Sequence, residues 1–253
     1  MKKIEVEAHR GFSAVYPENT LLSFEKAMKL GVDRMEFDIW LSKDKVPVIM
    51  HDSNPFRTCS VAGDLREMTL EEIKRLSPCY ETRYADLFEG MVQVPTLREL
   101  LELKKRVRPD MKLGVEIKDF REETVDVVLE LLNEYGVFEQ CRFYAFNGRI
   151  LRYIKEKYKG TTLGYFDFQM QEFDGYDCYD RIGLWREIAV CEDRFLNRMC
   201  EHYERLGVIP QVFGVDTEEQ VRYCINKGTD TITVNDPRIA MKVIKEYEEK
   251  GYV

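Results

Sequence analysis

The chain has 253 residues, of which 44% are hydrophobic and 33% charged, and its formal net charge is −8. This composition is typical of a globular protein and excludes intrinsic disorder, while the length suits one barrel domain of about 250 residues. The negative charge argues against nucleic-acid binding, which depends on a positive field. A small anionic substrate would therefore need a local basic site or a bound metal.

Seven cysteines are scattered through the chain without a Cys-x-x-Cys pair. This spacing argues against zinc ribbons and a disulfide framework, and it favours buried, reduced thiols. The first residues lack the apolar core of a signal peptide, and no apolar run approaches the roughly 18 residues that a membrane span needs. We therefore expect a cytoplasmic protein without a membrane span. Nothing in the sequence indicates an oligomeric state.

In chain order, short β-rich runs alternate with longer helical patterns, which indicates a parallel sheet covered by helices. The predicted strands are residues 4–9, 34–41, 112–118, 142–146, 161–166, 187–191, 209–215 and 230–234. The predicted helices are residues 21–30, 97–105, 122–135, 149–157, 194–205, 218–227 and 238–249. Close to eight such units predict an α/β fold of the TIM (β/α)8 barrel type.

The predicted helices also carry end signals. Thr96 and the pair Asp216-Thr217 stand before two helix starts and offer side-chain oxygens to N-terminal N–H groups. A glycine follows each of five helices, in the position where a left-handed C-cap is common. These glycines are Gly31, Gly136, Gly160, Gly207 and Gly228.

One region interrupts the alternation. A β-like run at residues 46–50 leads to His51-Asp52, and residues 53–95 then hold one predicted short helix, at 70–76, within irregular polar sequence. We interpret 53–95 as a small insertion after the second strand region of a single domain, residues 1–253. No linker divides the chain.

Three clusters of reactive residues lie near the ends of predicted strands, where barrel enzymes place their catalytic groups. They are His9-Arg10-Gly11, then Glu36-Phe37-Asp38 with His51-Asp52, and Glu116-Ile117-Lys118. Side chains alternate along a strand, so Glu36 and Asp38 share one face, as do Glu116 and Lys118.

The three acids of these clusters predict a metal site. Converging carboxylates inside an apolar barrel repel one another unless a cation neutralises them. We therefore expect Glu36, Asp38 and Glu116 to be oxygen ligands of one divalent cation, Mg²⁺ or Ca²⁺. The alternative is that they pair with basic side chains and bind nothing, which the two histidines at matching strand ends disfavour.

The chain has three histidines, and two of them, His9 and His51, lie in these clusters. Imidazole titrates near neutral pH, so one histidine can accept a proton from the nucleophile while the other protonates the leaving group. We regard His202, on a predicted surface helix, as incidental. Arg10 and Lys118 supply positive charge for a phosphate or balance the acids, and both roles can coexist.

Together these residues form a string of motifs along the first half of the chain. In order they are His9-Arg10-Gly11, Pro17-Glu18-Asn19-Thr20, Glu36-x-Asp38, Lys43-Asp44, His51-Asp52, Pro95-Thr96-Leu97 and Glu116-x-Lys118. The string resembles the glycerophosphodiester phosphodiesterase family. The resemblance implies metal-dependent hydrolysis of a glycerophosphodiester to glycerol 3-phosphate and an alcohol. It leaves open direct attack by water or attack by the glycerol hydroxyl through a cyclic intermediate.

The resemblance also implies roles for single residues. His9 and His51 would be the acid-base pair, Arg10 and Lys118 would hold the phosphate, and the three acids would hold the cation. The remaining positions would lie at the edge of the site or behind it: Glu18 and Asn19 from the Pro17–Thr20 motif, and Asp52 beside His51.

Three departures from the family pattern leave the alcohol head group open. Phe213 stands where the family often has tryptophan near the substrate, so we expect an apolar wall of altered shape there, at the rim of the site. Ala145-Phe146-Asn147 replaces Ser-Phe-Asp, and Val234-Asn235-Asp236-Pro237 replaces Thr-Asp-x-Pro. The alternative within enzymes is a lysophospholipase D-like phosphodiesterase. The alternative outside enzymes is a catalytically silent barrel that binds a phosphodiester.

Two other features have two interpretations each. Glu7 shares its strand face with His9, so it either orients a site residue or is paired inside the barrel. The aromatic and acidic segment 165–179 either selects a cationic head group or is a solvated loop with aromatics packed beneath it.

Overall fold

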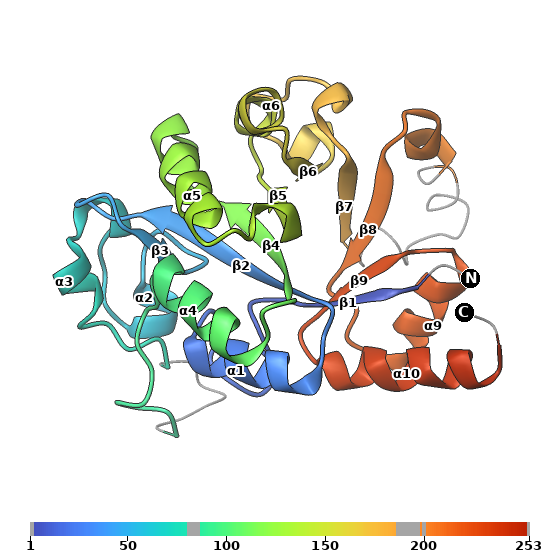
Figure 1. Ribbon diagram of the computed structural model, residues 1–253, viewed down its shortest axis with the longest axis horizontal. Coiled ribbons are helices and arrows are strands. Elements are labelled where there is room, and N and C mark those ends of the chain that lie inside the picture. The colour runs from blue at the N-terminus through green and yellow to red at the C-terminus, as the bar shows by residue number, and fades with distance from the viewer. Residues whose placement is uncertain (1–2, 80–86, 186–197, 199–200, 252–253) are drawn as a thin grey trace.

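The computed structural model describes residues 3–79, 87–185, 198 and 201–251. Eight parallel strands close into a barrel, because β1 pairs with β9 on one side and β2 on the other (Figure 1). The predicted TIM-type barrel is confirmed. Its strands are β1 Glu5–Ala8, β2 Arg34–Leu41, β4 Lys112–Ile117, β5 Cys141–Tyr144, β6 Thr161–Gly164, β7 Arg181–Trp185, β8 Ile209–Phe213 and β9 Thr231–Val234.

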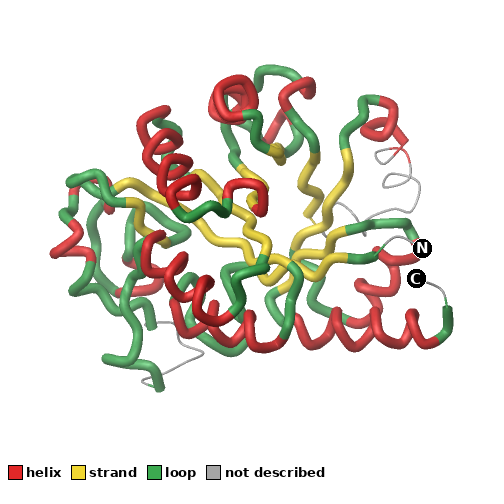
Figure 2. The backbone as a smooth tube through the Cα atoms, viewed as in Figure 1, coloured by secondary structure: helices red, strands yellow, loops and turns green. Residues whose placement is uncertain are grey.

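Helices surround these strands, as Figure 2 shows. In α4, Leu97, Leu100, Leu101 and Leu103 recur on one face and are buried, so an amphipathic pattern sets which side packs on the barrel. The main helices are α1 Leu21–Leu30, α4 Leu97–Val107, α5 Glu122–Glu134, α6 Gly148–Tyr153, α9 Glu218–Asn226 and α10 Pro237–Glu249. A π-helical segment, η3 Ile154–Tyr158, continues α6.

The helix ends follow the predicted signals closely. Thr96 forms a capping box with Glu99, and Thr217 forms one with Gln220, so both predicted N-caps are present. Four of the five predicted C-terminal glycines have positive φ. At the remaining helix end Lys159, not Gly160, takes the left-handed conformation.

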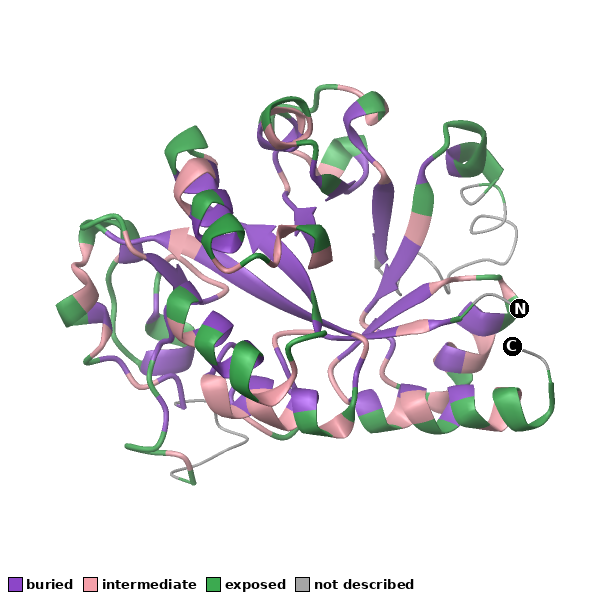
Figure 3. Cartoon of the chain, in the orientation of Figure 1, coloured by how far each residue is buried: buried purple, intermediate pink, exposed green. Residues whose placement is uncertain are grey.

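Most residues of the barrel strands are buried, as the purple parts of the strands in Figure 3 show. In β2, Met35, Phe37 and Ile39 join the main hydrophobic cluster together with buried residues of α1 and α4. Because side chains alternate, Glu36 and Asp38 face the barrel interior instead. The hydrophobic residues of β2 thus anchor the strand against the helices and aim its two acids inward.

The sixth strand of the barrel differs from the prediction. It is β7, Arg181–Trp185, which pairs with β6 and β8. The predicted strand, 187–191, lies outside the described residues. Because β7 occupies the place between β6 and β8, the prediction of 187–191 as the sixth barrel strand was wrong. Glycine is a weak strand former, but a Cβ at Gly183 would lie 2.4 Å from the Tyr165 ring, so tertiary packing selects it. Of the predicted helix 194–205, residues 198 and 201–205 are described and helical.

A short strand, β3 Pro47–Ile49, runs antiparallel to β2 and leads into His51. Between β3 and α4 lie three short helices: α2 Phe56–Cys59, η1 Leu65–Glu67 and α3 Leu70–Ile73. Their apolar side chains form a small separate cluster with those of β3, made of Val48, Met50, Cys59, Leu65, Ile73, Leu76 and Val94. We keep our interpretation of residues 53–95 as an insertion within one domain.

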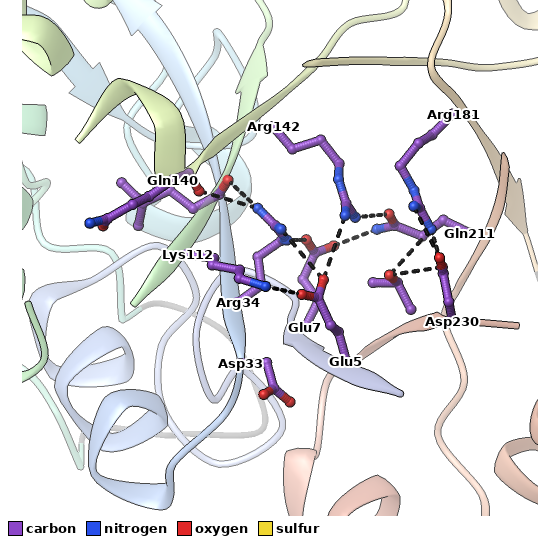
Figure 4. A network of polar contacts seen from close by, with 12 residues as sticks. Glu5, Glu7, Asp33, Arg34, Lys112, Gln140, Arg142, Arg181, Gln211 and Asp230 are labelled. Atoms are coloured by element: carbon purple, nitrogen blue, oxygen red, sulfur yellow. Dashed lines mark hydrogen bonds and ion pairs between the residues drawn. The ribbon is translucent and has the colours of Figure 1, made fainter. Parts of the chain in front are cut away.

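A buried polar layer fills the barrel near the N-terminal ends of its strands (Figure 4). Glu7 is fully buried there and accepts hydrogen bonds from Gln211 and Thr233, both at 2.8 Å, and from Tyr144 at 2.6 Å. Arg34 of β2 lies 3.7 Å from Glu7 in an ion pair, and further ion pairs of this layer join Arg142 of β5 to Glu5 and Arg181 of β7 to Asp230. Glu7 is therefore an acid paired inside the barrel, the second of its two interpretations.

The described cysteines are buried, as predicted, and no disulfide joins them: Cys59, Cys79, Cys141, Cys178 and Cys224. Cys191 and Cys200 lie outside the described residues. In the part of the chain that the structure describes, no helix has the length and apolar character to cross a membrane. The cytoplasmic location stays a prediction.

Candidate active site

Strand register brings the three predicted metal ligands together. Asp38 of β2 lies directly opposite Glu116 of β4, and Glu36 precedes Asp38 by two residues on the same face. One carboxylate oxygen from each of the three acids lies within 4.8 Å of the other two, and all three residues are buried. The predicted acid cluster therefore forms inside the barrel, toward the C-terminal ends of β2 and β4.

The hydrogen bonds of this cluster are incomplete. Glu36 accepts the Arg10 backbone N–H at 2.9 Å with one oxygen, and Asp38 accepts the Asn19 amide at 2.8 Å with one oxygen. Among the described residues, neither Oε1 of Glu36 nor Oδ1 of Asp38 has a hydrogen-bond donor. The Lys118 ammonium lies 3.2 Å from Asp38 Oδ1, which is an ion-pair contact only. Buried carboxylate oxygens that lack a hydrogen-bond donor are suitable ligands for a hard cation.

The electrostatics of the cluster point the same way. Burial, followed by the charges of Asp38 and Glu116, raises the pKa of Glu36 well above its usual range. Burial also acts to raise the pKa of Asp38, but the charges of Lys118 and Arg10 outweigh it and lower that pKa. Burial and two negative neighbours thus disfavour the ionised form of Glu36. A divalent cation bound beside it would stabilise that ionised form.

Both predicted phosphate-binding residues contact these acids. Arg10 lies 3.1 Å from Glu18 and 3.3 Å from Asp38. Lys118 lies 2.5 Å from Glu116. The charge-balancing contacts considered for these bases are therefore present, and Glu18 and Asn19 lie directly behind the cluster. A phosphate-binding role for Arg10 and Lys118 stays a prediction.

The two histidines follow β1 and β3. The His9 backbone N–H donates to Val234 at 2.9 Å, and its Nδ1 lies 2.8 Å from the Asn235 side-chain oxygen. His51 Nδ1 lies 2.7 Å from Asp52, as the adjacent motif suggested. Burial, followed by the charge of Arg10, lowers the pKa of His9 to about 4. Each ring thus has Nδ1 engaged by an oxygen, which directs Nε2 away from that partner.

The insertion supplies a residue that the sequence analysis missed. Arg57, on α2, donates to Asp52 at 2.6 Å and to Glu18 at 2.6 Å. Glu18 in turn contacts Arg10, so one guanidinium connects the surroundings of both histidines. No motif marked Arg57, because its importance depends on where α2 packs.

Asn235 and Asp216 were also missed as site residues. Asn235 appeared in the sequence only as a departure from the family pattern, which was the one available signal. Its side-chain amide contacts His9 and also donates to Asp216 at 2.8 Å. Asp216 follows β8 and Asn235 follows β9, and β9 lies between β8 and β1 in the barrel.

An aromatic wall lies beside the acids. Phe213 packs against Tyr144 and Tyr165, with ring centroids 6.1 and 6.0 Å apart, and Phe146 stacks on Tyr165 at 3.8 Å. The Lys118 ammonium lies 5.4 Å from the centre of the Phe146 ring. The apolar wall expected at Phe213 is thus built jointly with two tyrosines that the sequence analysis did not single out.

The acids of segment 165–179 have local partners. Arg152 pairs with Asp174 and Asp177, and Arg149 pairs with Glu172. These contacts hold the segment against α6 and favour the packed-loop interpretation over selection of a cationic head group.

Comparison with known proteins identifies the family. The model of the glycerophosphoryl diester phosphodiesterase family matches residues 9–239. The chain belongs to this family. A glycerophosphodiester phosphodiesterase of Bacillus altitudinis is 36% identical over 256 residues, covering 96% of this chain and 98% of that protein. One from Caldanaerobacter subterraneus subsp. tengcongensis is 29% identical over 251 residues, covering 96% and 99%. The resemblance is confirmed, and the predicted class of enzyme, a phosphoric diester hydrolase, is supported with it.

Solved structures agree on the fold. An Oleispira antarctica phosphodiesterase in complex with the product sn-glycerol-3-phosphate has a TM-score of 0.82 at 24% identity, covering 95% of this chain and 96% of that chain. The glycerophosphodiester phosphodiesterase of Thermotoga maritima has a TM-score of 0.74 at 22% identity, covering 96% and 99%. Both share the barrel of this family member.

Proposed function

We propose that the protein hydrolyses glycerophosphodiesters to glycerol 3-phosphate and an alcohol, using one divalent cation and the pair His9 and His51. One observation carries the proposal: three buried acids converge beside two histidines, and two of their oxygens lack hydrogen-bond donors. The names of the two bacterial relatives and the product bound to the Oleispira enzyme support the substrate class.

Glu36, Asp38 and Glu116 would hold the cation, Mg²⁺ or Ca²⁺, because their oxygens fit a hard cation and two of these oxygens, Glu36 Oε1 and Asp38 Oδ1, lack a hydrogen-bond donor among the described residues. When bound, the cation would supply positive charge against the charge that develops on the phosphoryl oxygens. Asn19 would position Asp38 through its amide hydrogen bond.

The chain's own side chains would do the rest. Arg10 and Lys118 would turn part of their hydrogen bonding from the acids to the phosphate oxygens. One histidine would take the proton of the attacking hydroxyl, from water or from the substrate's glycerol, and the other would protonate the leaving oxygen. Asp52 would orient His51, and Phe213 would form an apolar wall beside the substrate.

The test is hydrolysis of glycerophosphocholine, glycerophosphoethanolamine and glycerophosphoglycerol with Mg²⁺, Ca²⁺ or EDTA. We expect His9→Ala and His51→Ala each to lower kcat by about 10²- to 10⁴-fold, and EDTA or Glu36→Ala to remove activity. His202→Ala, an exposed histidine, is the matched control. Unchanged turnover in EDTA would refute the metal, and full activity of His51→Ala would refute the histidine pair.

One observation favours a second candidate substrate, a lysophospholipid. Val15, Phe56 and Phe168 are 36%, 61% and 77% exposed, on segments that follow β1, β3 and β6. Apolar side chains on this side of the barrel could contact an acyl chain. Comparing kcat/KM on lysophosphatidylcholine and glycerophosphocholine decides between the two, and a Phe168→Ser variant should lower only the first.

A further inference from the structure

The hydrogen bond between His9 and Asn235 is built into the seam where the barrel closes. The parallel register of β1 and β9 places Ala8 opposite Val234, so the next residues along the two strands, His9 and Asn235, leave the barrel side by side. The His9 backbone N–H donates to Val234 at 2.9 Å, which anchors this register at its last step. The 2.8 Å contact between His9 Nδ1 and Asn235 Oδ1 therefore lies on rigid elements.

The orientation of the Asn235 amide follows from its other partners. Asp216 accepts the Asn235 backbone N–H at 2.9 Å with one oxygen and the side-chain Nδ2 at 2.8 Å with the other. A carboxylate only accepts, so the amide nitrogen has to face Asp216 and the amide oxygen has to face His9. Ser13 also donates to that oxygen, at 3.1 Å.

An amide oxygen only accepts, so the His9 nitrogen that faces it has to carry the hydrogen. We propose that Asn235, oriented by Asp216, is a positioning residue that holds His9 as the Nδ1–H tautomer and leaves the Nε2 lone pair for proton transfer. This inference rests on the proposed role of His9 in acid-base chemistry.

Asp216 is essential to this arrangement because asparagine is ambiguous. If the amide turned over, its NH₂ group would face His9 Nδ1 and would select the opposite tautomer. In a serine protease, asparagine in place of the carboxylate behind the histidine selects the wrong tautomer and lowers kcat by about 10⁴-fold. Here the carboxylate of Asp216 accepts a hydrogen bond from Asn235 Nδ2, which prevents the amide from turning over. His51 needs no such device, since its Nδ1 faces the carboxylate of Asp52 directly.

The test is the tautomer itself, read from ¹⁵N-histidine spectra of the Mg²⁺-loaded protein at about pH 8, above the ordinary imidazole pKa. The chain has three histidines, so loss of a signal in His9→Gln assigns His9. We expect a proton on Nδ1 and none on Nε2 in the wild type. An Nε2–H form of His9 in the wild type would overturn the proposal, and the one variant that this reading requires to fold is His9→Gln, which assigns the signal.

Variants extend the test to function. Asp216→Asn should populate the Nε2–H form and lower kcat by about 10²- to 10⁴-fold with little change in KM. The exchange Asn235→Asp with Asp216→Asn keeps an acceptor on Nδ1 and should restore the tautomer and most of kcat. Asp236→Asn, whose carboxylate pairs with Arg238, is the matched control for an acid-to-amide change.

Two results separate the possible failures. An Asp216→Asn protein with wild-type tautomer and kcat would overturn the positioning role. Full activity in His9→Gln would overturn the proposed function of His9, while the spectrum would still report whether Asn235 sets the tautomer.

Discussion

Glu36→Gln should stabilise the protein in EDTA while it removes cation binding. One oxygen of each acid lies within 4.8 Å of the others, and two unit charges at that limit repel by ~3.5 kcal/mol at an effective dielectric constant of about 20. Asp38 and Glu116 both act on Glu36 in this sense, and the charge of Arg10 opposes them. Glu36 can avoid this repulsion by taking up a proton, which limits the loss of stability at pH 7 to ~3.4 kcal/mol. The reason is that keeping the proton costs about 1.36 kcal/mol for each pH unit above the ordinary pKa of 4.5.

Glutamine keeps the acceptor for the Arg10 N–H and carries no charge. With the attraction of Arg10 lost as well, we expect a net gain of about 1–2 kcal/mol in the free energy of unfolding, or roughly 2–8 °C in Tm for a chain of this size. Thermal unfolding in EDTA measures it. Glu130→Gln, a change at an exposed glutamate of α5, is the matched control and should stay within about 0.5 kcal/mol.

Addition of Mg²⁺ should make the wild type more stable to heat than Glu36→Gln, the reverse of the order in EDTA. A ligand at 100 times its Kd stabilises the native state by about 2.7 kcal/mol, and only the wild type should gain this. The reasoning is wrong if Glu36→Gln unfolds at a lower temperature than the wild type in EDTA, or if Mg²⁺ stabilises both proteins equally.

Arg57→Ala removes ion pairs from the surroundings of both histidines, so we expect about a 10-fold lower kcat on glycerophosphocholine with wild-type Tm. An unchanged kcat would contradict a role of Arg57 in positioning the site. Gly114→Ala should lower the free energy of unfolding, measured in urea, by about 1–3 kcal/mol, because a Cβ there would lie 2.9 Å from side chains inside the barrel. The control is Gly63→Ala, where the nearest atom would lie 3.5 Å from the Cβ, and it should have little effect. Burial raises the pKa of Glu5, but its hydrogen bond to Lys112 and nearby arginines lower it overall. Its stabilising contribution is therefore full above about pH 4.5 and is lost as the pH falls through the lowered pKa, so Glu5→Gln should cost more stability at pH 7 than at pH 3. An equal cost at both would refute the ion-pair explanation.

Local patterns in the sequence were enough to predict that the three proposed metal ligands form a cluster. Glu36 and Asp38 are two residues apart on one strand, so alternation alone places them on the same face. Glu116 needed one more assumption, that its strand lies near theirs, and the barrel rhythm of strands and helices supplied it. The helix caps at Thr96 and Thr217 were equally local, because a capping box is formed within four residues.

Other features depended on contacts that no local pattern records. β7 contains Gly183, and glycine is a weak strand former, yet the ring of Tyr165 lies where a Cβ at this position would be, which is a tertiary contact. The link from Arg57 to Asp52 and Glu18 exists only because the insertion folds back on the barrel mouth.

The partner of His9 illustrates the division most directly. The sequence by itself determined the reactive residues and the strands that carry them, since both follow from residue type and from alternation over a few positions. Only the closure of the barrel decided that Asn235, 226 residues away, would lie against the His9 ring. Closure pairs the first strand with the last, and that pairing depends on the summed twist and register of all eight strands, which no single segment of the chain determines.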